Sequence, residues 1–365
     1  MDASTTTALA TLLGAATGGL TSALATWLTH RTQARAQPGC RSHLATRRRV
    51  SQEAPMSGLH HVTAIAGNPP HNLNFYRHIL GLRLVKRTVN FDDPGTYHFY
   101  YGDETGRPGT VLTFFIWEHA GRGRVGVGET QQTAFRVPVQ SLGYWTHRFV
   151  EQGVSHQAPE KRFGQSVLAF SDPDGMRLAL VGVSDATSEP GWSGTDIPPE
   201  HAIRGFHGVM LLLDDATKTG SVLTTVLGLK EAGREGSVIR YRAASSPGGI
   251  VDIYQAKGFL PGRQGHGSVH HIAFRAKDDA EQAEMARKLV TQHNLHPTGQ
   301  RDRTYFRSIY FREPGGVLFE IATEAPGFAV DEPLASLGNS LKLPPSLEPQ
   351  RKEIESELPP LGVLA

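Results

Sequence analysis

An internal repeat is the feature that most constrains how this chain of 365 residues can fold. Two openings recur, each followed by Leu-Gly-Leu, and His61 and Gly81 are separated by the same number of residues as Gly208 and Gly228. Two later segments also match in order, Ala134-Phe135-Arg136 before Pro173-Asp174-Gly175 and Ala273-Phe274-Arg275 before Pro314-Gly315-Gly316. Matched pairs in the same order predict a duplicated chain with four similar units.

The local pattern of the first unit predicts what each unit contains. Apolar residues at helical spacing over 72–80, ended by Gly81, indicate a helix. Alternating apolar and polar residues bounded by Gly and Pro turns indicate four strands, at 59–66, 82–90, 97–102 and 110–117. The order strand, helix, strand, strand, strand, present four times in two tandem halves, predicts an α+β fold.

Composition places the boundaries of these parts. The segment before residue 203 is rich in Ser, Gly, Pro and Asp, which is typical of a linker, and a proline-rich tail with one short charged helix follows the last unit. The expected parts are an N-terminal extension at 1–55, a first pair of units at 56–185, a linker at 186–202, a second pair at 203–326 and a tail at 327–365.

The N-terminal extension allows three interpretations. Residues 8–28 carry no charge and precede a basic segment, so they form a weak membrane anchor, a poorly ordered extension, or a region upstream of a true start at Met56. The basic flank would keep an anchored protein facing the cytoplasm. We expect a cytoplasmic protein, with the anchored form as the alternative.

Composition also excludes classes of function. The single cysteine, Cys40, excludes an internal disulfide and any site built from several thiolates. The formal net charge of +2 gives no strongly basic face for nucleic acid. Any metal site must therefore use imidazole and carboxylate ligands, and the 17 histidines supply many candidates.

Two His-His pairs and one glutamate form the candidate site. Because side chains alternate along a strand, one histidine of each pair is expected to face the site and the other to face away or reach its edge. Glu320 lies in an apolar strand, where a lone carboxylate is costly unless it is paired or binds a metal. The repeat places Gly208, Gln132 and Ala179 opposite His61, His271 and Glu320, so one metal site is expected, where the first and fourth units meet. We expect most other histidines, His98 and His207 among them, at the surface.

Two histidines and a carboxylate suit a non-haem Fe(II) site that handles O2, or Zn²⁺ with a hydrolytic water. At these residues the sequence resembles the vicinal-oxygen-chelate superfamily, and within it the hydroquinone ring-cleaving dioxygenases. The matching segments are spread over residues 56–335, a span of about three quarters of the chain: residues 58–63, 84–89, 97–100, 107–110, 204–207, 270–271 and 312–320.

The resemblance implies four βαβββ modules and one Fe(II), with Mn(II) as a substitute, held by His61, His271 and Glu320. It further implies that His60, Thr63, His270, Arg303 and Tyr310 surround the metal. His270 is expected to exchange protons near neutrality, and Arg303 and Tyr310 to stabilise negative charge on oxygen. The N-terminal extension departs from the family pattern.

The function expected from these features is an Fe(II)-dependent extradiol-type dioxygenase that opens hydroquinone or related diphenol rings. Its partners would be the diphenol and O2, without nucleic acid, and a homo-oligomer is left open. Two alternatives are a metal-dependent glyoxalase-like lyase or isomerase, which needs no O2, and a metal-free module that binds an aromatic compound. The histidines and the glutamate argue against the metal-free module.

Overall fold

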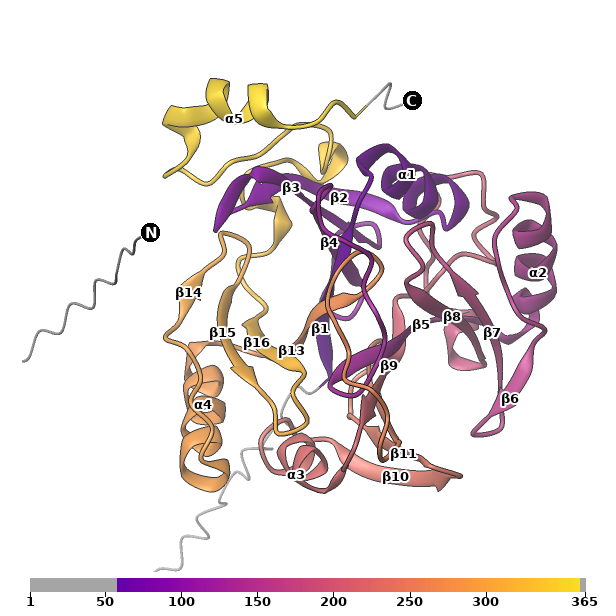
Figure 1. Ribbon diagram of the computed structural model, residues 1–365. Helices are drawn as coiled ribbons and strands as arrows, with labels where there is room; N and C mark the ends of the chain where they lie inside the picture. The colour runs from indigo at the N-terminus through magenta and orange to yellow at the C-terminus, as the bar shows by residue number, and fades with distance from the viewer. Residues whose placement is uncertain (1–57, 362–365) are drawn as a thin grey trace, which may run out of the picture. The chain divides into compact units, whose positions relative to one another are not determined.

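Two curled eight-stranded sheets, flanked by helices, dominate the structure (Figure 1). The structure is a computed structural model that describes residues 58–361. The predicted α+β fold with repeated βαβββ modules is confirmed, because the strand-helix-strand-strand-strand order occurs four times. The candidate anchor at 8–28 and the predicted extension at 1–55 lie outside the described residues. Within the described range, none of the helices is both long enough and apolar enough to cross a bilayer.

The first two modules follow each other along the chain. The first consists of β1 (Leu59–Ala66), α1 (Pro69–Leu73), a π-helical turn (Asn74–Ile79), β2 (Arg83–Asn90), β3 (Asp93–Gly102) and β4 (Val111–Ile116). The second consists of β5 (Glu129–Pro138), a 3-10 turn (Val139–Ser141), α2 (Leu142–Glu151), β6 (Glu160–Arg162), β7 (Gln165–Ser171) and β8 (Arg177–Val183). The helix expected at 72–80 therefore begins earlier, where the Asn68 side chain accepts a hydrogen bond from the His71 backbone, and changes to π-helical geometry halfway.

The second half repeats this order. The third module consists of β9 (Phe206–Leu213), α3 (Thr217–Thr225), β10 (Lys230–Glu235), β11 (Val238–Arg242) and β12 (Ile250–Gln255). The fourth consists of β13 (Val269–Ala276), α4 (Asp279–His293), β14 (Arg301–Asp302), β15 (Arg307–Arg312) and β16 (Leu318–Thr323). Short 3-10 turns lie at Asp185–Ser188, Phe328–Val330, Leu334–Ser336 and Glu348–Gln350, and the tail contains α5 (Arg351–Glu357).

The modules exchange partners between halves. The first sheet has the order β14-β15-β16-β13-β1-β4-β3-β2 and joins the first and fourth modules, while the second sheet, β10-β11-β12-β9-β5-β8-β7-β6, joins the second and third. The register is also repeated: His61 pairs with Val111 as Gly208 pairs with Ile250. The two sheets can therefore be compared position by position.

Alternation along β1 divides the core from the site. Val62 and Ala64 belong to the main hydrophobic core, which the helices cover, whereas His61 and Thr63 line a pocket on the other face. Burial of apolar side chains on the helix-covered face stabilises the fold, so the pocket face is left to polar residues.

The pairing of β1 with β13 shifts at two places, and each shift adds one histidine. Leu59 pairs with Phe274 and His61 with Ala273, so His60 is the extra residue on β1; Thr63 pairs with His271 and Ala64 with Val269, so His270 is the extra residue on β13. A bulge places two residues opposite one and interrupts strict alternation. Each His-His pair therefore sits at a bulge.

The tail packs along β2 through a buried lysine. Lys86 is fully buried, and its Nζ lies 2.5 Å from Asp331 Oδ1 and 2.6 Å from Glu332 Oε2. The Lys342 backbone N–H also donates to the Arg87 carbonyl, at 2.9 Å. Because an unpaired buried ammonium is costly, the two tail carboxylates fix this part of the tail against the first sheet.

Candidate metal centre and substrate pocket

Three buried side chains from three strands meet where the first and fourth modules join. His61 of β1, His271 of β13 and Glu320 of β16 are 2 %, 5 % and 0 % exposed. Glu320 Oε2 lies 2.9 Å from His271 Nε2 and 3.4 Å from His61 Nε2. The possible ligand atoms of the three residues all lie within 4.8 Å of one another. The repeat in the sequence predicted that these three residues would meet, and the structure places them side by side.

This group fits a divalent transition metal. Glu320 Oε1 accepts a short hydrogen bond from the Ser308 hydroxyl, whereas the buried Oε2 meets no described donor at hydrogen-bonding angles. Burial acts to raise the pKa of Glu320, but the imidazoles of His61 and His271 hold it well below its ordinary value. Two imidazole nitrogens and one ionised carboxylate oxygen thus converge, the ligand set of non-haem iron sites.

Each candidate ligand histidine is oriented by its neighbour at the bulge. Nδ1 of His61 lies 2.9 Å from Nδ1 of His60, and Nδ1 of His271 lies 2.8 Å from Nδ1 of His270. When Nε2 of a ligand histidine binds metal, its Nδ1 carries the proton and donates to the neighbour. The structure agrees with the prediction that the other histidine of each pair faces away or reaches the edge of the site: His60 is not among the residues that line the pocket, whereas His270 is.

Both neighbouring histidines are neutral. Burial, and then repulsion from the adjacent ligand histidine, lower the pKa of His60 and of His270 to about 3. The expectation that His270 titrates near neutrality is wrong in this structure, because aromatic rings desolvate it: Phe115 and Trp117 lie 5.4 and 5.7 Å from its ring. His270 can still donate or accept a hydrogen bond as a neutral imidazole.

A pocket of about 340 Å³ opens beside the three ligand candidates. Its walls include Phe91, Phe115, Trp117, Phe306 and Leu318. The Phe115 and Trp117 rings are nearly parallel, with an interplanar angle of 10°. Apolar and aromatic walls with a few polar groups are typical of a site for a small, flat organic molecule.

Arg303 and Tyr310 lie on this wall, as expected, and form one unit with Asp92. Arg303 Nε donates to the Tyr310 hydroxyl at 3.1 Å, and Nη2 lies 3.0 Å from Asp92 Oδ2. Burial raises the pKa of Tyr310, so its hydroxyl stays protonated. The Tyr310 hydroxyl thus accepts from Arg303 and also lies in hydrogen-bonding contact with Ser308, which donates to Glu320. Two residues close to them in the sequence lie differently: Arg301 also lines the pocket, whereas Tyr305 donates to Asp331 of the tail.

Thr63 ends a hydrogen-bonded chain that the sequence did not reveal. The Tyr100 hydroxyl lies 3.0 Å from His98 Nδ1, His98 Nε2 lies 2.8 Å from Thr113 Oγ1, and Thr113 Oγ1 lies 2.8 Å from Thr63 Oγ1. Burial raises the pKa of Tyr100 and lowers that of His98, so Tyr100 donates to a neutral imidazole. The chain then runs towards Thr63 and leaves the Thr63 proton for an acceptor in the pocket.

His98 therefore corrects the expectation of a surface histidine. It lies in β3 and lines the pocket together with Tyr100. The available signal was alternation: His98 and Tyr100 share one face of a predicted strand. What the sequence could not give was the pairing of β3 with β4, which brings His98 to Thr113.

The comparisons with known proteins agree with this geometry. The family model described as the Glyoxalase/Bleomycin resistance protein/Dioxygenase superfamily matches residues 58–180 and 200–321. The chain belongs to this superfamily. Its predicted resemblance to the vicinal-oxygen-chelate proteins is thereby confirmed.

Individual relatives indicate which class of enzyme within the superfamily this chain resembles. The chain is 44% identical over 306 residues to MhqO of Bacillus subtilis strain 168, named as a ring-cleaving dioxygenase, and covers 97% of it with 84% of its own length. It is 35% identical over 308 residues to the chlorohydroquinone/hydroquinone 1,2-dioxygenase of Sphingobium indicum UT26S, with 82% of this chain and 95% of that protein covered. A crystal structure of a protein from B. subtilis strain 168, described as a dioxygenase, has a TM-score of 0.80 and 43% identity, covering 85% of this chain and 99% of the other. The expectation of an enzyme of the dioxygenase class is confirmed.

Proposed function

We propose that this protein is an Fe(II)-dependent ring-cleaving dioxygenase that opens hydroquinone or related diphenol rings with O2. The observation that carries the proposal is the convergence of His61 Nε2, His271 Nε2 and Glu320 Oε2 beside an aromatic-walled pocket. The relatives named for ring cleavage and for hydroquinone support the reaction and the substrate class. Mn(II) suits the same ligands.

His61, His271 and Glu320 would hold the metal. A bound Fe(II) would supply a Lewis acid that favours the ionised diphenol and a redox centre able to react with O2. The two histidine pairs would fix the rings of the ligands, because each ligand Nδ1–H has an acceptor on its neighbour. His60 is anchored in turn by a hydrogen bond to the Thr323 backbone.

The pocket residues would bind and orient the ring. Phe115, Trp117 and Phe306 offer apolar surface that excludes water from the bound ring. Thr63 would donate its hydroxyl proton to a substrate oxygen, because the chain behind it leaves that proton unused. His270, a neutral imidazole on the pocket wall whose Nδ1 accepts from His271, would donate its Nε2 proton to a second oxygen in a hydrogen bond.

Arg303 and Tyr310 would stabilise negative charge that develops on oxygen. The guanidinium polarises the Tyr310 hydroxyl at 3.1 Å, which strengthens that hydroxyl as a donor. Asp92, in the loop between β2 and β3, restrains the Arg303 guanidinium from the other side. Donors fixed in advance in a dry site lower the barrier more than mobile donors in water.

The experiment that tests the proposal is O2 uptake by the Fe(II)-loaded full chain. The protein is loaded anaerobically and given a panel of substituted hydroquinones and catechols, while O2 and the ultraviolet spectrum are recorded. We expect equal consumption of O2 and diphenol with loss of the aromatic spectrum. Absence of O2 uptake over the whole panel would overturn the proposal, and turnover of a hemithioacetal without O2 would establish the lyase or isomerase alternative.

Metal content gives a readout that does not depend on activity. Glu320→Ala is expected to lose bound iron, because it removes the only carboxylate among the three ligand candidates. Glu284→Ala on the exposed face of α4 is the matched control and is expected to bind iron as the natural chain does. Equal iron in both variants would remove Glu320 from the ligand set.

A further inference from the structure

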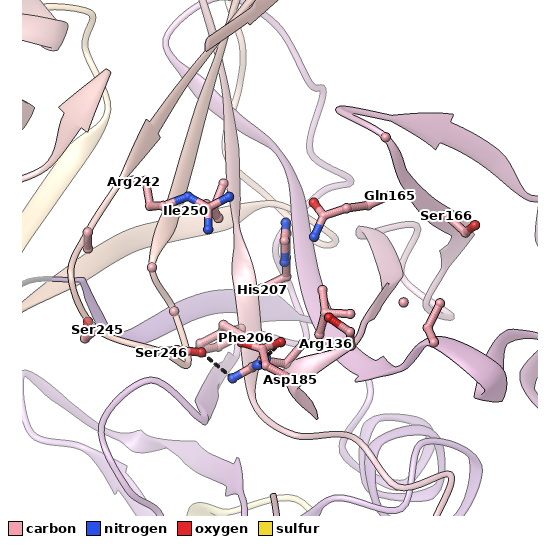
Figure 2. Close-up of a pocket in the computed structure, with 18 of the residues that line it drawn as sticks. Arg136, Gln165, Ser166, Asp185, Phe206, His207, Arg242, Ser245, Ser246 and Ile250 are labelled. Atoms are coloured by element: carbon pink, nitrogen blue, oxygen red, sulfur yellow. Dashed lines mark hydrogen bonds and ion pairs between the residues drawn. The ribbon is translucent and has the colours of Figure 1, made fainter. Parts of the chain in front are cut away.

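A second cavity, of about 690 Å³, lies on the second sheet, away from the candidate metal centre (Figure 2). Its origin follows from the comparison of two hairpins. The β6–β7 turn at Phe163-Gly164 corresponds to the β14–β15 turn at Thr304-Tyr305, and both turns begin with a residue in the left-handed region, at φ 48° and 69°.

The corresponding side chains differ greatly in size. Gly164 and Gln165 stand where Tyr305 and Phe306 fill the first sheet, and Phe328 of the tail packs on Tyr305 at 5.1 Å between ring centres. These three aromatic rings belong to one buried cluster in the first sheet. The second sheet leaves the equivalent space open, since a glycine and a glutamine cannot fill it.

The wall of this cavity is positively charged. Arg136, Lys161 and Arg242 line it, and Asp185 is the one carboxylate among its described lining residues. Asp185 lies 2.8 Å from Arg136 Nη2, so it neutralises that guanidinium. Arg242 is exposed and has no ion-pair partner within the described part of the chain, and Lys161 donates to Ser166 at 2.8 Å. Two cations on the wall are thus without an opposing carboxylate.

His207 adds an unused hydrogen-bonding atom to this wall. It occupies the bulge position of β9 that His60 occupies in β1, and its buried Nε2 has no hydrogen-bond partner within residues 58–361. Burial, followed by repulsion from Arg240, Arg136, Arg242 and Arg162, lowers its pKa to about 3. Figure 2 shows the His207 ring, the Arg242 guanidinium and the Gln165 amide directed towards the same part of the cavity.

We propose that this cavity is a binding site for a small organic anion that carries a carboxylate or a phosphate. Arg242 and Lys161 supply the charge, and the amide N–H groups of Gln165, whose Oε1 accepts from Arg240, supply a neutral hydrogen bond. The volume exceeds that of an inorganic ion, so the ligand has a carbon skeleton beside its acidic group.

The test is calorimetric titration of the full chain at low salt with three probes of one skeleton. Glycerol 3-phosphate and glycerate distinguish a phosphate from a carboxylate ligand, and glycerol is the neutral control. We expect one of the two anions to bind, glycerol not to bind, and the affinity to fall as salt is raised. Failure of both anions to bind at millimolar concentration, or equal binding of glycerol, would overturn the proposal.

Variants locate the binding. Arg242→Gln is expected to weaken binding at least about tenfold, since it removes a charge-assisted hydrogen bond, and Arg287→Gln on α4 is the matched loss of an exposed arginine elsewhere. Gln165→Phe restores the bulk of Phe306 and is expected to abolish binding while the iron content and the O2 uptake stay unchanged. Wild-type affinity in Arg242→Gln, or an equal loss in Arg287→Gln, would contradict the site.

Discussion

The two sheets have the same strand order and register, yet their equivalent faces do different things. In the first sheet His61, His271 and Glu320 converge. In the second, the register places Gly208, Gln132 and Ala179 at these positions, of which none is a metal ligand of the same kind. The duplication therefore preserved the frame and placed the candidate chemistry in one copy.

In the second sheet, a salt bridge occupies the space that corresponds to the substrate pocket of the first sheet. Arg240 and Asp252 stand where Tyr100 and Thr113 stand in the first sheet, and they form two hydrogen bonds of 2.8 Å. Gly208 is required as well, because a Cβ there would lie 2.1 Å from the Ile250 carbonyl oxygen. A ligand histidine therefore cannot be placed at 208 without moving the backbone. The lesson is that strand geometry alone does not make a metal site; close packing around one residue can forbid it.

The largest effect is expected from making the first sheet like the second. His271→Gln installs the residue found at position 132 and should lower iron content and O2 uptake at least about 100-fold, because it removes a proposed ligand and not merely a supporting group. Iron analysis and an oxygen electrode measure both. The reverse change, Gln132→His, should create no second iron site, and two irons per chain in that variant would break the comparison.

The next largest effect concerns the Arg240–Asp252 salt bridge, which takes the place of the hydrogen-bonded chain from Tyr100 to Thr63. Arg240→Met leaves Asp252 buried without its partner and should lower the free energy of unfolding by about 3–5 kcal/mol. Tyr100→Phe, at the equivalent position of the first sheet, removes one neutral hydrogen bond and should cost about 1 kcal/mol. Urea unfolding of both variants measures the difference; equal costs would show that the two sheets are not stabilised differently.

A smaller effect, on the turnover rate, is expected from replacing His98 by valine, the residue found at the equivalent position 238 of the second sheet. His98→Val breaks the chain from Tyr100 to Thr63, so the Thr63 hydroxyl loses its fixed direction. We expect the turnover rate to fall about 10–100-fold with unchanged iron content, the range typical of groups that orient a metal site. Thr113→Val should act in the same direction. Loss of iron in either variant would instead indicate a ligand-supporting role.

The smallest effect is a pH dependence in which the sheets should behave alike. Asp172 follows β7 and Glu313 follows β15, and each accepts a hydrogen bond from the backbone four residues on, Met176 and Val317. Burial raises the pKa of Asp172 to about 7 and also raises that of Glu313. The folded state therefore keeps a proton that the unfolded state releases near pH 4, and stability falls as pH rises from about 4 to about 7.

Asp172→Asn should remove part of this slope. Between pH 5 and 7 the natural chain should lose about 1 kcal/mol or more that the variant retains, as measured by denaturant unfolding at each pH. Glu313→Gln should change the slope with the same sign. An unchanged slope in either variant would show that the carboxyl is already ionised in the folded state.

The repeat made the fold and the three candidate ligands predictable, because equal spacings in the sequence became equal registers in the sheets. The short charged helix predicted in the tail is present at Arg351–Glu357. His98 and His207 were missed because a histidine in a strand reveals nothing of its neighbours until the strands are paired. The bulges were missed for a similar reason: an extra residue such as His60 is defined only against Ala273 of a strand more than half the chain away.

The order of the strands has a consequence for synthesis. The second sheet is contiguous in the chain, from β5 to β12, so it can close once Gln255 has left the ribosome. The first sheet takes β1 to β4 from one end and β13 to β16 from the other, and β1 has an unpaired edge until β13 is made. Such distant pairing folds slowly and leaves a strand edge open to other chains. A metal held as proposed by His61, His271 and Glu320 could meet all three ligands only after β16 has been made and paired with β13.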